Sequence, residues 1–256
     1  MLYFDVHPNS VERLPFTLTE SSVLAVIPAR FHSTRLPGKI LAEIAGKPMI
    51  EHVYRRASAA ARVHGVVIAT DDERIASAVR AFGGAAIMTR PDHVSGTDRI
   101  AEAVAQLSCA IVVNVQGDEP LVDPATIDAA IAPLLEDGSV DMSTISRPFK
   151  GRDEFESRHV VKVVVNNSGE ALYFSRAPLP GAAAHVGLYV YRRDTLLKLA
   201  STPAARLELE ESLEQLRALV NGIRIRVVET AHVAAGVDTP EDLERVRQLL
   251  LSPVRT

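Results

Sequence analysis

The spacing of apolar and polar positions in the first half of the chain predicts an α/β fold. Short, almost wholly apolar runs are typical of strands buried on both faces, and the segments between them carry apolar residues at helical spacing. We expect strands at residues 23–29, 66–70, 85–89 and 110–115, and helices at residues 48–62, 72–82, 97–107 and 124–136. Strands that alternate with helices indicate a mostly parallel central sheet with helices on both faces.

The second half is less regular and predicts a smaller, mixed α/β lobe around residues 145–215. We expect a hairpin of strands at 160–165 and 171–174, a strand at 185–192, a helix at 206–220, a strand at 223–229 and a closing helix at 239–251. The Asn-Asn-Ser-Gly sequence inside the hairpin is typical of a tight turn. We therefore expect one domain over residues 23–256 that contains the lobe, preceded by an N-terminal extension, residues 1–22, with no assigned role.

Composition and charge exclude several classes of protein. The chain has 256 residues, of which 47% are hydrophobic and 23% charged, which is ordinary for a globular protein. A net charge of −4 gives no general attraction to nucleic acid or to an anionic membrane. The only cysteine, Cys109, excludes an internal disulfide and a cysteine-rich zinc site. No apolar stretch is long enough to span a bilayer, and residues 1–22 do not resemble a secretion signal, so we expect a cytoplasmic protein without a membrane partner.

The loop after the first strand, residues 29–39, is the clearest candidate for a binding site. It carries Arg30, Arg35 and Lys39 and no carboxylate, although the whole chain is slightly acidic. Gly38 allows the backbone to approach a ligand closely. Cations and exposed backbone N–H groups at the end of a strand are typical of a polyphosphate site. The spacing fits neither a dinucleotide-binding glycine motif nor a P-loop.

Two aspartates are candidate metal ligands. Asp118 follows the strand at 110–115, and its hard oxygens suit Mg²⁺, although a turn that uses Asp118 for its own hydrogen bonds explains the sequence equally well. Asp238 precedes Thr239, the expected N-cap of the last helix, with Pro240 at its first position. Asp238 is therefore not needed as a cap. Its carboxylate either points into a cleft or is exposed to solvent.

Other polar segments have both a functional and a purely structural interpretation. Ser95 either caps the helix that follows or, with Arg90, recognises the edge of a pyrimidine. His185 and Tyr189 share one face of a strictly alternating strand, which is either a wall for a hydroxylated ligand or a half-exposed surface. Several polar residues of the lobe are either ligand contacts or ordinary surface: Lys162, Arg176, Glu214 and Gln215.

Many segments, in one order from about Val23 to Arg247, resemble the 3-deoxy-manno-octulosonate (Kdo) cytidylyltransferase family. They include VIPAR, STRLPGK, GKPMIEHVYRRA, ATDDERI, MTRPDH, SGTDRIAE, VVNVQGDEP, ALYFSRAPLP, LEQLRAL and GVDTPEDLERVR. VIPAR and LPGK alone would indicate only a sugar nucleotidyltransferase. The resemblance implies a Rossmann-like nucleotidyltransferase fold and an enzyme that joins CTP to Kdo, giving CMP-Kdo and pyrophosphate for lipopolysaccharide synthesis.

The resemblance also implies roles for individual residues. Arg30 and Lys39 would bind the triphosphate, and Asp118 and Asp238 would hold Mg²⁺. Backbone around Ala29, with Arg90 and Ser95, would recognise cytosine. The sugar pocket would be lined by Gln116, His185, Tyr189, Glu214 and Gln215, with Lys162 and Arg176 near its acidic end. Family likeness further suggests a homodimer.

Departures from the family pattern leave two alternatives open. Only residues 181–184 separate the SRAPLP-like segment from the strand that begins at His185, where relatives have a longer stretch. Ser157-Arg158-His159 stands where relatives tend to show Asn-Pro-Asn. Because the short segment lies on the sugar side, a related acid such as 8-amino-Kdo is an alternative substrate. The alternative of another class is a nucleotide- or sugar-acid-binding protein without turnover, which the retention of both aspartates and of the loop cations disfavours.

Overall fold

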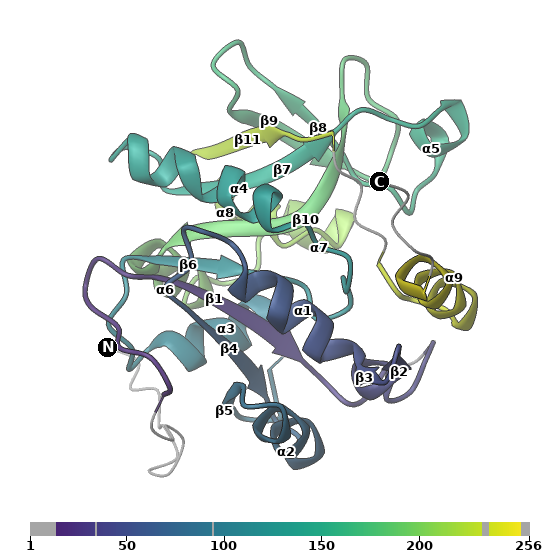
Figure 1. The fold of residues 1–256 in the computed structure, drawn as a ribbon. Helices are drawn as coiled ribbons and strands as arrows, with labels where there is room; N and C mark the ends of the chain where they lie inside the picture. Colours follow the sequence, from purple (N-terminus) through teal and green to yellow (C-terminus); the bar gives the residue numbers. More distant parts are fainter. Residues whose placement is uncertain (1–13, 34, 94, 232–235, 252–256) are drawn as a thin grey trace. The chain divides into compact units, whose positions relative to one another are not determined.

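The computed structural model describes residues 14–33, 35–93, 95–231 and 236–251, and the chain forms two compact units (Figure 1). The first unit combines residues 1–127 with 234–256, and the second comprises residues 128–233. The second unit is larger than the lobe expected at 145–215. It also takes in most of helix α4 (Pro124–Glu136) and strand β11 (Ile225–Glu229), because β11 pairs with a strand of this unit.

The strands of the first unit are parallel and lie in the order β6-β1-β4-β5. They are β1 (Val23–Ala29), β4 (Gly65–Thr70), β5 (Ala85–Met88) and β6 (Ile111–Asn114). All residues of β4 and β6, and all but Pro28 in β1, are buried, which explains why these strands are apolar without alternation. The strand order reverses direction at β1, and ligands bind at such a point beyond the carboxyl ends of the strands.

Helices α1 (Met49–Ser58), α2 (Glu73–Ala81) and α3 (Gly96–Val104) connect these strands. Because parallel crossovers are right-handed, the change of direction at β1 places α3 on the face opposite α1 and α2. Figure 1 shows α2 beside the edge strand β5. The short elements η1 (Lys39–Leu41), β2 (Glu43–Ile44) and β3 (Lys47–Pro48) precede α1, and α9 (Pro240–Leu251) packs against β2.

In the second unit, β10 (Ala183–Arg192) is antiparallel to β7 (Met142–Arg147), which is parallel to β11. The hairpin of β8 (Lys162–Val165) and β9 (Ala171–Ser175) was predicted and joins β10 through β8. The helices of this unit, besides most of α4, are α5 (Arg152–Glu156), α6 (Arg193–Ala200), α7 (Arg206–Glu211) and α8 (Gln215–Val220). The residue pattern did not predict β7, α5 or α6. The α/β class and the mixed, mostly parallel character of the strands agree with the prediction.

Two predicted elements differ from the structure. The helix expected at 206–220 is divided into α7 and α8 because Ser212 adopts a left-handed conformation with φ of 53°. The expected strict alternation of 185–191 is interrupted, because the register with β7 shifts between Val186 and Tyr189. In both places the pattern of residue types is regular and the backbone is not.

The described part of the N-terminal extension packs against the first unit. The Phe16 ring covers Gly65, where a Cβ atom would lie 2.4 Å from the ring. The buried Ser22 accepts backbone hydrogen bonds from Ala110 and Ile111 through its carbonyl oxygen. Residues 14–22 are therefore part of the fold, whereas residues 1–13 lie outside the described residues. No helix in the described ranges is both long and apolar enough to cross a membrane.

Candidate active site

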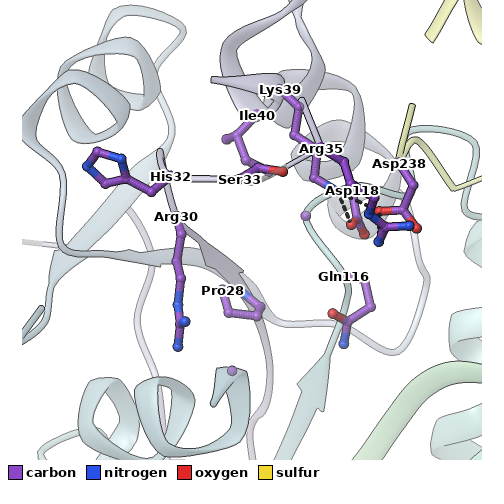
Figure 2. A pocket seen from close by; sticks show the side chains of 12 residues that line it. Pro28, Arg30, His32, Ser33, Arg35, Lys39, Ile40, Gln116, Asp118 and Asp238 are labelled. Carbon is purple, nitrogen blue, oxygen red and sulfur yellow. Dashed lines mark hydrogen bonds and ion pairs between the residues drawn. The ribbon is translucent and has the colours of Figure 1, made fainter. Parts of the chain in front are cut away.

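A polar cavity of about 370 Å³ lies in the first unit, at the carboxyl ends of β1 and β6. Its lining includes Arg30, Arg35 and Lys39 from the loop after β1, and Gln116 and Asp118 from the loop after β6. Asp238, from the segment that precedes α9, completes this group of charged and polar side chains (Figure 2). The cavity thus combines the cationic loop with both candidate metal ligands.

Lys39 lies between the two aspartates. Its ammonium nitrogen is 2.7 Å from Asp118 Oδ2 and 3.0 Å from Asp238 Oδ1, and it donates to the Val237 carbonyl oxygen at 2.9 Å. Arg35 Nη2 approaches the same Asp238 oxygen at 2.9 Å. Burial lowers the pKa of Lys39, but the charges of the two aspartates and the hydrogen bonds to them outweigh burial and raise the pKa above 10.5. Lys39 is therefore positively charged at neutral pH.

The arrangement of oxygen ligands around this ammonium fits a divalent cation. Two carboxylates lie within hydrogen-bond distance of one nitrogen, so they converge on a single cationic position. Mg²⁺ is commonly held by one or two carboxylates, with phosphate oxygens and water completing an octahedron. No group of three or more histidine, cysteine or acidic residues suited to a metal occurs among the described residues. A metal ion held by Asp118 and Asp238 would therefore need substrate phosphates or water as its remaining ligands.

Local sequence explains how these side chains reach the cavity. Gly117 brings the loop after β6 against β1, where a Cβ atom would lie 3.0 Å from the Pro28 carbonyl oxygen. Val237 N donates to the Asp118 carbonyl oxygen at 2.9 Å and so ties the two aspartate segments together. At the start of α9 the predicted cap is present, because Asp242 N donates to Thr239 Oγ1 and Thr239 N donates to Asp242 Oδ2.

Arg30 has a different orientation from the other loop cations. Figure 2 shows its side chain directed away from Lys39, Asp118 and Asp238. Its Nη2 donates to the His93 carbonyl oxygen at 2.6 Å, so in this structure Arg30 contacts the loop that carries Arg90. Ala29, the last residue of β1, is buried. The loop cations therefore form two groups around the cavity rather than one.

Described residues on both sides of position 94 in the predicted base-recognition loop make hydrogen bonds with α3. Ser95 caps α3, because its hydroxyl accepts a hydrogen bond from Asp98 N at 3.1 Å, and the neighbouring Gly96 lines the cavity. The structural interpretation of Ser95 is thereby confirmed, and it does not exclude a backbone contact to a base. Arg90 is half exposed, and its backbone N–H donates to the buried Glu102 of α3.

The residues predicted for the sugar pocket fall into both units. Gln116 lines the cavity of the first unit, and its amide donates to Asn114 Oδ1 at 3.0 Å. The other predicted residues lie in the second unit. There the ring centroids of His185 and Tyr189 are 5.4 Å apart, and the ring centroid of Phe174 of β9 lies 5.1 Å from that of His185. These aromatic rings form one group on β9 and β10.

His185 is neutral at physiological pH. Burial lowers the pKa of its imidazole to about 3. Its Nε2 is 2.9 Å from Thr144 Oγ1, and the same hydroxyl lies 2.8 Å from the Leu188 carbonyl oxygen. A carbonyl oxygen can only accept a hydrogen bond, so the single hydroxyl proton of Thr144 is donated to Leu188. Nε2 of His185 therefore carries the imidazole proton and donates to the Thr144 oxygen. Nδ1 is then a hydrogen-bond acceptor suited to a hydroxyl group.

Arg176, Glu214 and Gln215 lie around the junction of α7 and α8. The Arg176 guanidinium donates to the carbonyl oxygens of Glu211 and Ser212, and its backbone N–H donates to the Glu211 carboxylate. Glu214 is exposed, whereas Gln215 is buried and its Nε2 has no hydrogen-bond partner within the described part of the chain. A buried amide without a partner is costly, so Gln215 is suited to donate to a ligand.

Lys162 does not fit its predicted role at the acidic end of the sugar. Its side chain is fully buried, and its ammonium donates to the carbonyl oxygens of Ser157, Val160 and Arg176. Burial lowers the pKa of Lys162, and Arg158 lowers it further. With its ammonium directed at backbone, Lys162 joins β8 to the end of β9, and we correct its assignment from a ligand contact to a structural residue.

Comparison with known proteins defines the class of this chain. Residues 24–225 match the family model described as cytidylyltransferase. The 3-deoxy-manno-octulosonate cytidylyltransferase of Geobacter sulfurreducens is 55% identical over 248 residues, covering 90% of this chain and 99% of that protein. The protein of the same name from Solibacter usitatus is 52% identical over 241 residues, covering 91% of this chain and 96% of its own length.

A solved structure of CMP:2-keto-3-deoxy-manno-octonic acid synthetase complexed with CTP is also similar. It has a TM-score of 0.87 and 46% sequence identity, and the alignment covers 90% of this chain and 98% of that chain. The chain belongs to the 3-deoxy-manno-octulosonate cytidylyltransferase family.

Proposed function

We propose that this protein transfers a cytidylyl group from CTP to Kdo, giving CMP-Kdo and pyrophosphate for lipopolysaccharide synthesis. Family membership supports the reaction, and the observation that carries it is the convergence of Asp118 and Asp238 on Lys39 beside the cationic loop. We also propose that the enzyme acts in the cytoplasm as a homodimer, as its relationship to the family suggests.

The reaction brings two anions together. An oxygen of the anomeric hydroxyl of Kdo forms a bond to the α-phosphorus of CTP, and the bond from that phosphorus to the bridging oxygen breaks. Pyrophosphate leaves with the bonding electrons, and the hydroxyl proton passes to solvent. Screening of the negative charges is the main requirement, so cations positioned before the reaction contribute most to the rate.

We assign the residues of the cavity to this screening. Asp118 and Asp238 would hold Mg²⁺, which when bound supplies positive charge next to the phosphates and makes a coordinated hydroxyl more acidic. Lys39 would exchange its aspartate partners for triphosphate oxygens, since an ammonium and a metal ion cannot occupy the same position. Arg30 would bind the triphosphate from the other side of the cavity.

We propose that cytosine binds against the backbone at Ala29 and the loop that carries Arg90 and Ser95. For the sugar acid we propose Gln116 as a contact, as the family resemblance suggests. The resemblance also suggests His185, whose Nδ1 can accept a hydrogen bond from a sugar hydroxyl, together with Tyr189, Glu214 and the buried Gln215 amide. Arg176 would hold the turn before Glu214 rather than the sugar.

A pyrophosphate-release assay that crosses CTP, UTP, ATP and GTP with Kdo, 8-amino-Kdo and N-acetylneuraminate tests this proposal. We expect release in the presence of Mg²⁺ only with CTP, and fastest with Kdo. Faster turnover of 8-amino-Kdo than of Kdo would show that the enzyme prefers the amino sugar. The short 181–184 segment would then be the expected cause of that preference. Binding of CTP and Kdo without release of pyrophosphate would instead identify a binding protein.

A further inference from the structure

Glu102 of α3 is a buried carboxylate that contacts the loop predicted to recognise cytosine. Only 7% of its side chain is exposed, and it contacts two residues of the loop after β5. Both carboxylate oxygens accept from Arg90 N, at 3.3 and 3.2 Å, and Oε2 lies 3.6 Å from Arg90 Nε. The same Oε2 makes a hydrogen bond with Nε2 of His93, which is also buried.

The contacts continue from this loop to Arg30, which we propose as a ligand of the triphosphate. The backbone carbonyl oxygen of His93 accepts from Arg30 Nη2 at 2.6 Å. Arg30 follows β1 and lines the cavity, whereas Glu102 belongs to the far half of α3. Contacts thus run from Glu102 through His93 to Arg30 of the cationic loop.

Helix α3 is a rigid support for this path. Arg99, one turn before Glu102, is fully buried and donates to Thr89 Oγ1 at 2.5 Å at the end of β5. Its Nη1 also lies 3.3 Å from Asp71 Oδ1, just after β4. The helix is therefore fixed to the ends of two strands. A charge-assisted hydrogen bond from a fixed helix restricts a loop more than a neutral one would.

We propose that Glu102 is a positioning residue for the nucleotide. It fixes the backbone of Arg90 directly and fixes the direction of Arg30 through His93, so recognition of cytosine and binding of the triphosphate are coupled. This inference depends on the nucleotide site of the proposed function and assigns no contact between Glu102 and the substrate.

The test compares Glu102→Gln with Glu51→Gln in the full-length protein. Glu51 is the matched control, because it is a similarly buried glutamate on helix α1 of the same unit and pairs with Arg55 at 2.7 Å. Calorimetry would measure the affinity for CTP and for UTP. We expect E102Q to weaken CTP binding about tenfold, which is about 1.4 kcal/mol, and to narrow the preference for CTP over UTP. E51Q should change neither quantity.

A double-mutant cycle with Arg30→Met tests the coupling. If Glu102 acts on Arg30 through His93, the double variant binds CTP at most about threefold more weakly than R30M alone, although E102Q alone costs about tenfold. Additive losses would overturn the coupling. A purely structural role would also overturn the proposal; it would appear as a lower melting temperature with equal losses for CTP and UTP.

The binding measurements separate this inference from the proposed function. Calorimetry with CTP requires no turnover, so it remains informative if the wild-type protein releases no pyrophosphate with Kdo. In active protein, E102Q should raise the KM for CTP and leave the KM for Kdo unchanged. An E102Q protein with unaltered CTP affinity and selectivity would overturn the positioning role even if the wild type is fully active.

Discussion

The Lys39 ammonium lies 2.7 Å from Asp118 Oδ2, and this ion pair occupies the position where a divalent cation would be bound. A lysine in that position neutralises carboxylates that would otherwise repel each other in a half-buried cavity. The proposed metal site would therefore become available only when Lys39 binds other partners. The triphosphate is such a partner, so we expect metal and nucleotide to bind in a mutually dependent way.

Replacing Lys39 should affect metal binding and catalysis in opposite directions. In Lys39→Met, kcat/KM should fall at least about a hundredfold because a cation on the triphosphate is lost. Binding of Mn²⁺ without nucleotide, measured by electron paramagnetic resonance, should become stronger because no ammonium competes for the aspartates. Lys47→Met, at an exposed lysine of the same unit, is the control. Weaker Mn²⁺ binding in K39M would contradict the exchange of partners.

The two aspartates should be needed to a similar extent. Asp118→Asn and Asp238→Asn each remove one carboxylate from the position shared with Lys39. We expect losses of several powers of ten in kcat, or roughly 4 kcal/mol of transition-state stabilisation. Pyrophosphate release at saturating CTP and Kdo measures this loss. A variant that retains more than about a tenth of the activity would show that its aspartate is not a metal ligand.

The contact between Phe16 and Gly65 predicts a specific pattern of stabilities. Gly65→Ala should destabilise the first unit, because the new Cβ atom would lie 2.4 Å from the Phe16 ring. Phe16→Ala should cost roughly 1–2 kcal/mol, because the ring is only partly buried. The double variant should be more stable than the sum of the single losses predicts. Urea unfolding measures all three, and strictly additive losses would mean that the ring moves aside at no cost.

Glu154 should contribute to stability in a way that depends on pH. Its hydrogen bonds with Arg147 lower its pKa from 4.5 to about 2, so the unfolded chain binds a proton more readily than the folded one. The contribution, roughly 2 kcal/mol, is fully present above about pH 4.5 and declines as the pH falls towards 2. The difference in unfolding free energy between wild type and Glu154→Gln should therefore be large at pH 7 and smaller at pH 3.5. Glu156→Gln, in an exposed pair with Arg152, should show little effect at either pH.

Arg176 should act on the sugar site through Ser212. In Arg176→Ala the carbonyl oxygens of Glu211 and Ser212 lose their guanidinium partner, and the strained turn before Glu214 should relax. We expect the KM for Kdo to rise about tenfold with little change in the KM for CTP. Ser212→Gly removes the strain of φ 53°, so adding it to R176A should recover part of the affinity. Direct contact between Arg176 and the sugar carboxylate would leave S212G without effect.

The strands that are predicted well from the sequence are those whose buried side chains are almost all apolar. Strand β7 was missed because its sequence, Met-Ser-Thr-Ile-Ser-Arg, is largely polar although five of its six residues are buried. The structure explains the difference, since Ser143 Oγ donates to the Ala130 carbonyl oxygen and Thr144 Oγ1 donates to that of Leu188. A hydroxyl that finds its partner far away in the sequence cannot be distinguished from a solvated one by pattern alone.

The candidate site shows the same limit. Resemblance assigned Asp118 and Asp238 to one metal, and the structure brings both side chains to one cavity. It could not indicate that Lys39 would lie between them, because that contact depends on the path of the chain over almost 200 residues. Glu102 was missed for a related reason, since a glutamate in an amphipathic helix is ordinarily solvated and only the fold directs it towards His93.

Asp238 lies in the segment that returns to the first unit after the whole second unit has been traversed. During synthesis on the ribosome, the strands that precede Arg30 and Asp118, β1 and β6, emerge long before this carboxylate. A nascent or prematurely terminated chain that ends before residue 238 therefore lacks one of the two proposed metal ligands. If the proposed site is correct, cytidylyl transfer is restricted to molecules whose translation has passed residue 238.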